Sequence, residues 1–135
     1  MQLTSPHFSL ALSLQVFQNE LSAIITATLE SDGFSAVSDM DTDIRALCMF
    51  TDALTQLYET LHGTASLKEP FGHQQHITFT GDGKGHIHIC GQLTGCRHSG
   101  FLQTLAFQNT IDQTYLPAFI RQLNEACRPY REACQ

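Results

Sequence analysis

The sequence predicts an α+β fold built on a mainly antiparallel β-sheet with two α-helices, in the order β-β-β-α-β-β-β-β-α. Apolar and polar residues alternate through the first forty residues, which is the period of half-buried strands. A helical period follows, and a second run of strands ends in another helical segment. Strands and helices in separate runs favour an antiparallel sheet over a repeated βαβ unit. The 135 residues show no internal repeat or linker, so we expect one domain over residues 1–135.

Three strands are expected before the first helix. Large apolar residues alternate with small or polar ones from Phe8 to Val16, and the alternation returns from Leu21 to Glu30. The short connection at residues 18–20 predicts an antiparallel hairpin. The turn residues Ser31–Gly33 then lead into a weaker third strand, from Phe34 to Met40.

The first helix is predicted from residue 44 to residue 61. Its apolar residues recur at steps of three and four, which places them on one face. They are Ile44, Leu47, Leu54, Leu57, Tyr58 and Leu61. Asp41, Thr42 and Asp43 can cap its N-terminus, where negative charge is favourable. Gly63 stands where a left-handed residue that closes a helix would lie.

The second half of the chain is rich in strands. A short strand is expected over Ala65–Lys68, and His76–Thr80 pairs with His86–Leu93 as a hairpin. Its connection holds three glycines that suit the positive-φ positions of a hairpin loop: Gly81, Gly83 and Gly85. After a loop over residues 94–100, a further strand is expected from Phe101 to Gln108.

The last predicted element is a helix from Tyr115 to Cys127. Its buried face would consist of Leu116, Phe119, Ile120 and Leu123. Thr114 is the best-placed cap, because Pro117 then lies in the first turn, where its missing N–H costs no hydrogen bond.

Charge and hydropathy narrow the function classes. Thirteen acidic residues stand against seven basic ones, which gives a net charge of −6. Nucleic-acid binding requires a basic face, so we expect no nucleic-acid partner, whereas a basic protein partner is compatible. No apolar run approaches the ~18 residues of a membrane span, and the first fifteen residues lack a signal-peptide pattern. We therefore expect a soluble, cytoplasmic protein without a membrane partner.

The cysteines are expected to be thiols in a reducing compartment, because their number is odd and their spacing irregular. They are Cys48, Cys90, Cys96, Cys127 and Cys134. Cys48 and Cys127 lie within predicted helices, where a cysteine typically acts as a small buried hydrophobe. Cys96, beside Arg97 and His98, has the most reactive setting, but no catalytic constellation surrounds it.

Histidines offer the clearest route to metal chemistry. If Ile87 and Ile89 face the core, His86 and His88 share the opposite face, and the preceding strand could bring His76 beside them. Three imidazoles with an open fourth position form a typical catalytic zinc site. The alternative is that they are exposed polar residues on the wet face of a sheet. We assign no catalytic residue and expect no metal and no cofactor.

Acidic residues gather before and within the first helix. They are Asp39, Asp41, Asp43 and Asp52. Capping together with a solvated face accounts for such a run. The functional alternative is an anionic patch that steers and docks a cationic partner, which would use all four aspartates.

Three stretches together resemble the WapI-type immunity proteins, small bacterial proteins found beside polymorphic toxins. The stretches are Leu57-Tyr-Glu-Thr-Leu-His-Gly63, Phe79-Thr-Gly-Asp-Gly-Lys-Gly-His-Ile87 and Asp112-Gln-Thr-Tyr-Leu-Pro-Ala-Phe119. The resemblance runs from about residue 43 to residue 123. It implies a non-enzymatic protein that binds and neutralises a toxin domain, with a nuclease as the expected class of toxin. The matching residues look architectural: Gly63, Gly81, Gly83, Gly85, Asp112, Gln113, Thr114, Tyr115 and Leu116.

Three hypotheses therefore stand at the level of sequence. The first is an immunity-like protein that binds a cognate, basic toxin domain and is itself a monomer or homodimer. The second is a small zinc-dependent enzyme or metal-binding protein that uses His76, His86 and His88. The third is a self-associating adaptor that uses an exposed strand edge.

Overall fold

The computed structural model describes residues 1–17, 21–70, 74–95 and 100–132. It contains two antiparallel four-stranded sheets and two α-helices, so the predicted α+β fold is confirmed. Sheet A has the order β1 (Gln2–Thr4), β2 (Phe8–Val16), β3 (Ser22–Ser31), β4 (Phe34–Asp43). Sheet B has the order β5 (His62–Lys68), β6 (His76–Asp82), β7 (His86–Thr94), β8 (Thr104–Asp112).

The helices connect and follow the sheets. Helix α1 (Ile44–Thr60) joins sheet A to sheet B. Helix α2 (Leu116–Cys127) follows sheet B; the short 3-10 helix η1 (Gln113–Tyr115) precedes it and η2 (Arg128–Tyr130) comes after it. Strand β1 was not predicted, because three residues are too few to show a period. The predicted turn at residues 18–20 and part of the loop at 94–100 lie outside the described residues.

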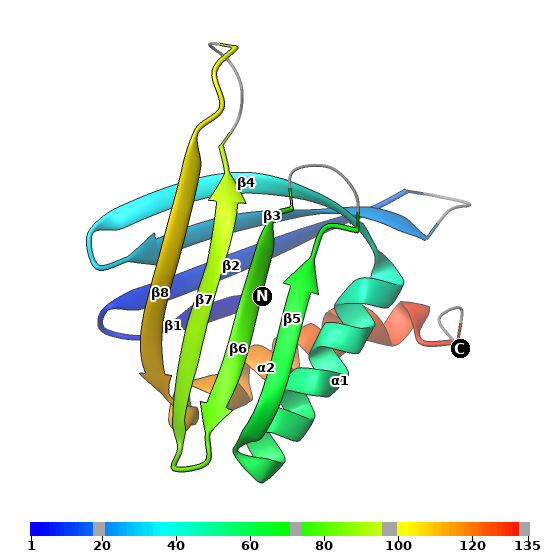
Figure 1. Cartoon of the computed structure of the whole chain (residues 1–135). Helices are drawn as coiled ribbons and strands as arrows, with labels where there is room; N and C mark the ends of the chain where they lie inside the picture. The colour runs from blue at the N-terminus through cyan, green and yellow to red at the C-terminus, as the bar shows by residue number, and fades with distance from the viewer. Residues whose placement is uncertain (18–20, 71–73, 96–99, 133–135) are drawn as a thin grey trace.

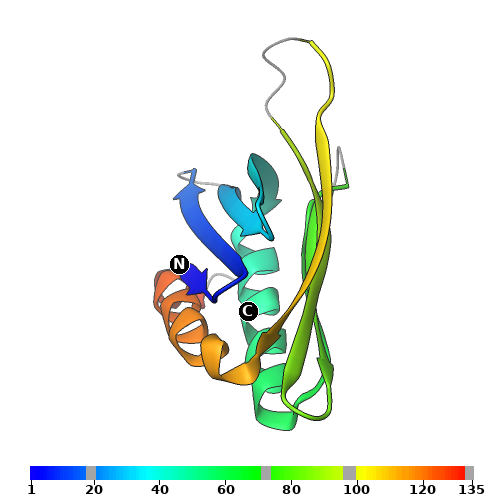
Figure 2. The same cartoon turned by 90° about the vertical axis from the view of Figure 1, so that its left-hand side faces the viewer.

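The two sheets are layered and their strands cross, with the helices packed between and beside them (Figures 1 and 2). Sheet A contacts sheet B where β4 passes behind β7, and α1 packs along β5. The centre of the core is aromatic. Phe79 of β6 lies between Phe50 of α1, at 5.7 Å between ring centroids, and Phe119 of α2, at 6.3 Å.

Helix α1 begins as predicted but ends differently. The Asp43 carboxylate accepts a hydrogen bond from the Ala46 N–H at 2.7 Å, which caps the N-terminus. Strand β4 continues to Asp43 instead of ending at Met40, because these residues pair with β3. The prediction that Gly63 closes the helix was wrong. The residue that closes the helix is Leu61, at φ 63°. Gly63 also has a positive φ, 102°, but it lies within β5, where it pairs with Gly81.

The glycine-rich turn lies where it was predicted, but only two of its three glycines have the predicted positive φ. Gly83 and Gly85 have φ values of 84° and 97°, which only glycine adopts readily. Gly81 lies within β6 and does not have positive φ. A Cβ atom there would stand 2.3 Å from the backbone oxygen of Leu61, so Gly81 is needed for close approach of two backbones.

The start of α2 also differs from the prediction. Strand β8 runs over Thr104–Asp112 instead of Phe101–Gln108, and η1 separates it from α2. Thr114 does not cap α2, whose N-cap residue Tyr115 makes no side-chain cap hydrogen bond. Asp112 caps η1 instead, because its carboxylate accepts a hydrogen bond from the Thr114 N–H at 2.9 Å. Pro117 lies in the first turn of α2, as predicted.

Candidate partner-binding surface

The charge of the chain is distributed unevenly between its two halves. Residues 1–44 contain six acidic residues and no lysine or arginine, whereas residues 45–135 contain seven of each sign. The whole net charge of −6 therefore comes from the segment that forms sheet A. Such segregation creates an anionic field over one part of the surface.

The outer face of sheet A carries most of these carboxylates. Alternation along paired strands places Asp39, Asp41 and Asp43 of β4 on the face that also holds Glu30 of β3. The Asp39 carboxylate accepts a hydrogen bond from the Thr26 hydroxyl at 2.7 Å. The backbone N–H of Asp41 donates to Glu69 at 2.9 Å, which brings a further carboxylate beside the strand. We call Asp39, Asp41, Asp43 and Glu69 the β4 acidic strip.

Within the described residues no lysine or arginine forms an ion pair with the β4 acidic strip. Asp39 and Asp41 are exposed, whereas Asp43 is half-buried and holds the N-terminus of α1. In the described part of the chain, the exposed carboxylates of Asp39 and Asp41 therefore face solvent without a lysine or arginine counter-ion. A cationic surface could approach them without first breaking an ion pair.

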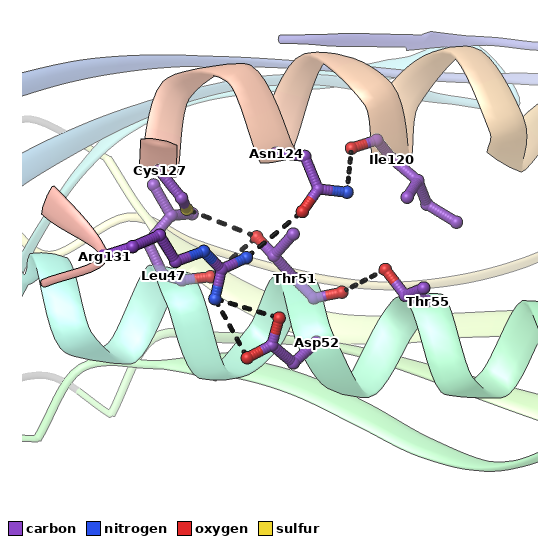
Figure 3. Close-up of polar contacts among 8 residues, drawn as sticks. All are labelled: Leu47, Thr51, Asp52, Thr55, Ile120, Asn124, Cys127 and Arg131. Carbon is purple, nitrogen blue, oxygen red and sulfur yellow. Dashed lines mark hydrogen bonds and ion pairs between the residues drawn. The ribbon is translucent and has the colours of Figure 1, made fainter. Parts of the chain in front are cut away.

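Asp52 does not belong to this strip. It lies on α1, where Arg131 Nη1 donates to its carboxylate at 3.0 Å (Figure 3). This hydrogen bond raises the pKa of Arg131 above its ordinary value. Arg131 Nη2 also donates to the Asn124 side-chain oxygen at 3.1 Å. The predicted group of four aspartates is thus divided: three share one face, and the fourth helps to join the end of the chain to α1.

Both cysteines predicted to be buried are buried. Cys48 is 3% exposed and Cys127 is fully buried. The Cys127 Sγ atom lies 3.6 Å from the Thr51 hydroxyl oxygen, between α1 and α2 (Figure 3). Cys96, His98 and Cys134 lie outside the described residues.

The histidines share a face but do not form a cluster. Ile87 and Ile89 are fully buried, so His86 and His88 face solvent as expected. His76 lies opposite Gln92, four residues further along β7 than His88. That offset is about 13 Å along the strand, too far for three imidazoles to reach one ion. Among the described residues, no group of three or more His, Cys, Asp or Glu could hold a metal ion.

His86 instead contacts an aspartate on the β6–β7 turn. Its Nδ1 atom lies 2.9 Å from the Asp82 carboxylate, which also accepts the Lys84 N–H at 2.7 Å. The Lys84 N–H, followed by the hydrogen bonds from His86, lowers the pKa of Asp82. A carboxylate with a lowered pKa in the folded state stabilises the fold above its unfolded pKa, and this contribution disappears as pH falls.

Acid should therefore weaken the fold partly through Asp82. We expect the thermal unfolding midpoint to fall between about pH 5 and pH 2, and Asp82→Asn to make that fall shallower. Calorimetry across this pH range measures both slopes. Glu59→Gln, which removes an exposed carboxylate of α1, serves as the control and should keep the wild-type slope. Equal slopes for wild type and Asp82→Asn would contradict the assignment.

A comparison with known protein families identifies the family of this chain. Residues 7–131 match the Immunity protein WapI-like family, which is nearly the whole chain. The chain belongs to this family. Neither a curated protein nor a solved structure matches it. The resemblance seen in the sequence is thereby confirmed.

In this member of the WapI-like family, the recognisable motif joins two distant segments. The Gln113 N–H donates to the Gly85 oxygen at 2.9 Å, so the stretch that begins at Asp112 is anchored on the glycine turn between β6 and β7. Leu116 then enters the core with no exposed surface, whereas Tyr115 remains 37% exposed. These contacts join η1 and the start of α2 to the β6–β7 turn and to the core.

Sequence patterns missed one residue on which the acidic surface depends. Gln75 is 3% exposed, and its side chain connects three backbone or side-chain groups from β4 and β7. Its amide oxygen accepts hydrogen bonds from the Ser38 hydroxyl and from the Thr94 N–H, and its amide nitrogen donates to the Asp39 oxygen at 2.9 Å. A glutamine in a polar stretch carries no sequence signal of such burial.

The described helices give one further negative finding. Neither α1 nor α2, nor any other helix in the described residues, has the length and apolar character needed to span a bilayer.

Proposed function

We propose that this chain is a non-enzymatic immunity protein that binds and neutralises the domain of a cognate toxin in the cytoplasm of the producing cell. Membership of the WapI-like family supports the immunity role. The observation that carries the finer proposal is the charge distribution: the whole net charge lies in residues 1–44, and the outer face of sheet A has no cation. The partner it fits has a cationic surface.

A nuclease domain is the toxin class that best matches this surface. An enzyme that binds nucleic acid offers lysine and arginine side chains spaced to contact phosphates. Carboxylates at alternate positions of one strand, such as Asp39 and Asp41, can occupy such a surface and exclude the nucleic acid. Protection would then be stoichiometric and would involve no turnover.

The test begins by sequencing the reading frame beside the gene for this chain and co-expressing this chain with the C-terminal domain encoded there. We expect growth arrest when that domain is expressed alone, and normal growth when this chain is present. Purified together, the two proteins should elute as one complex, and its association rate should fall steeply as salt rises. Failure to bind and to protect would contradict the immunity proposal itself.

A charge-matched pair of variants tests the acidic strip separately. The first variant carries Asp39→Asn, Asp41→Asn and Glu69→Gln, and leaves Asp43 in place to cap α1. The second carries Glu59→Gln, Glu125→Gln and Glu132→Gln, three exposed positions outside sheet A. We expect the first variant to lower the association rate about tenfold and the second to change it much less. Equal effects would leave the immunity role standing and contradict the strip.

A further inference from the structure

Three of the four sheet edges are partly covered by the chain itself. At β1, the Gln2 N–H donates to the Gln122 side chain of α2 at 2.9 Å. At β4, the Asp41 N–H donates to Glu69 and the Asp39 oxygen accepts from Gln75, each at 2.9 Å. At β5, helix α1 packs alongside (Figure 1). Partial cover of this kind limits the addition of a further strand, which is how folded proteins avoid unwanted pairing.

Strand β8 is different. Its nine residues contain no lysine, arginine or proline, the residue types that usually protect an exposed edge. Figure 2, which looks toward this side, shows no other element of the described residues lying along its outer edge. One outward backbone N–H of this edge, that of Thr110, already has a partner, because it donates to the Asn109 side-chain oxygen at 2.8 Å. The open part of the edge is therefore the segment that precedes Asn109.

The direction of the backbone groups on β8 follows from the bonds at its two ends. Gln113 donates its N–H to Gly85, and the Gln103 oxygen accepts from Gly95, so odd-numbered residues point toward β7. Even-numbered residues point away, because a strand alternates its hydrogen-bonding sides. Within the described residues, the N–H and C=O groups of Ala106 and Gln108 have no partner. Two residues of the same strand thus offer a ladder for an added strand.

A pocket lies beside this ladder. Phe34, at the start of β4, is 68% exposed and stands over β8. Together with Leu105 and Phe107 it lines a cavity of about 210 Å³, whose remaining lining residues are Ser31, Asp32, Ala106 and Gln108. An added strand that pairs with β8 could place one apolar side chain in this cavity, because alternate side chains of a strand point to the same face.

Charge decides between the possible occupants. Asp32 contacts the Asn109 side chain at 3.3 Å, Asp112 ends β8, and neither β8 nor the pocket contains a cation. A second copy of this chain would bring the same carboxylates and a further net charge of −6 to the edge. A strand flanked by lysine or arginine would instead be attracted.

We propose that β8 binds an extended segment of the cognate toxin domain by strand addition. The segment pairs with Ala106 and Gln108, places an apolar side chain in the Phe34 pocket and directs a lysine or arginine toward Asp32. This inference rests on the proposed immunity function and names the part of the surface that gives the complex its backbone contacts.

The test uses the full chain and the toxin domain that the co-expression experiment identifies as its partner. Hydrogen exchange followed residue by residue should show that the amides of Ala106 and Gln108 exchange at least tenfold more slowly in the complex. Two variants should weaken binding at least tenfold. Ala106→Pro blocks the edge and removes no bond of the β7–β8 ladder, because the N–H of Ala106 points outward. Phe34→Ala removes one wall of the pocket.

Met49→Ala is the matched control for Phe34→Ala, because Met49 is a similarly exposed apolar residue, 65% exposed on α1. It should leave the affinity unchanged, and thermal melting verifies that each variant is folded. A complex that forms without added protection at Ala106 and Gln108, and that tolerates both variants, would overturn strand addition while immunity stands. Protection of β8 by self-association without toxin would identify a second copy as the occupant and also overturn it. Absence of any complex would overturn the immunity proposal.

Discussion

Phe79→Ala is expected to lower the free energy of unfolding by about 3–5 kcal/mol, the largest effect of any single change considered for this fold. Phe79 has no exposed surface, and its ring contacts one aromatic side chain from each helix, Phe50 and Phe119. Truncation removes the apolar contacts and leaves a cavity where sheet B meets both helices, so the surroundings cannot close without moving three elements.

Urea unfolding followed by circular dichroism measures this change. Phe34→Ala is the control, because it removes the same side chain from a site that is 68% exposed, and it should change the free energy of unfolding by less than about 0.5 kcal/mol. A loss below about 1.5 kcal/mol for Phe79→Ala would mean that the aromatic centre of the core is not packed as described.

Gln75→Leu should lower the free energy of unfolding by about 2–4 kcal/mol, although it places an apolar residue in a buried site. The substitution leaves the Thr94 N–H and the Asp39 oxygen without the partners that Gln75 provides, and the Ser38 hydroxyl keeps only its bond to the Thr94 oxygen. Each buried polar group that loses its partner carries its own desolvation cost, and connected groups add cooperatively.

Thr42→Val is the matched control, because Thr42 lies on the same buried face of β4 as Ser38, which Gln75 contacts. The Thr42 hydroxyl is buried and has no hydrogen-bond partner within the described residues, so its removal should be neutral or slightly stabilising. Parallel urea titrations compare the two variants. If Gln75→Leu behaved like Thr42→Val, the link between β4 and β7 would not depend on these hydrogen bonds.

The elements predicted well are those whose pattern is local. Helix α1 was found because its apolar residues repeat at the helical period over seventeen residues. The β2–β3 hairpin was found because both strands alternate over nine or more residues. Strand β8 begins and ends several residues later than predicted, because its alternation of apolar and polar residues is weak. Its last residue, Asp112, also caps η1. Patterns of this kind locate a face more reliably than a boundary.

The candidate site divides in the same way. That Asp39, Asp41 and Asp43 share a face follows from alternation alone once β4 is a strand. The pairing of Asp52 with Arg131 does not follow, because the two residues are 79 positions apart and meet only when α2 returns to α1. The offset of His76 from His88 likewise depends on the β6–β7 register, which no local pattern specified.

The amino-acid sequence by itself determined the class of the fold, its family, and the concentration of negative charge in residues 1–44. These properties depend on composition and on short-range period. Only the tertiary structure decided that Gln75 joins two sheets, that Gly81 admits a neighbouring backbone, and that β8 keeps an open edge. Each of those outcomes depends on which distant segments become neighbours, and that choice is made by packing and hydrogen bonding across the whole chain.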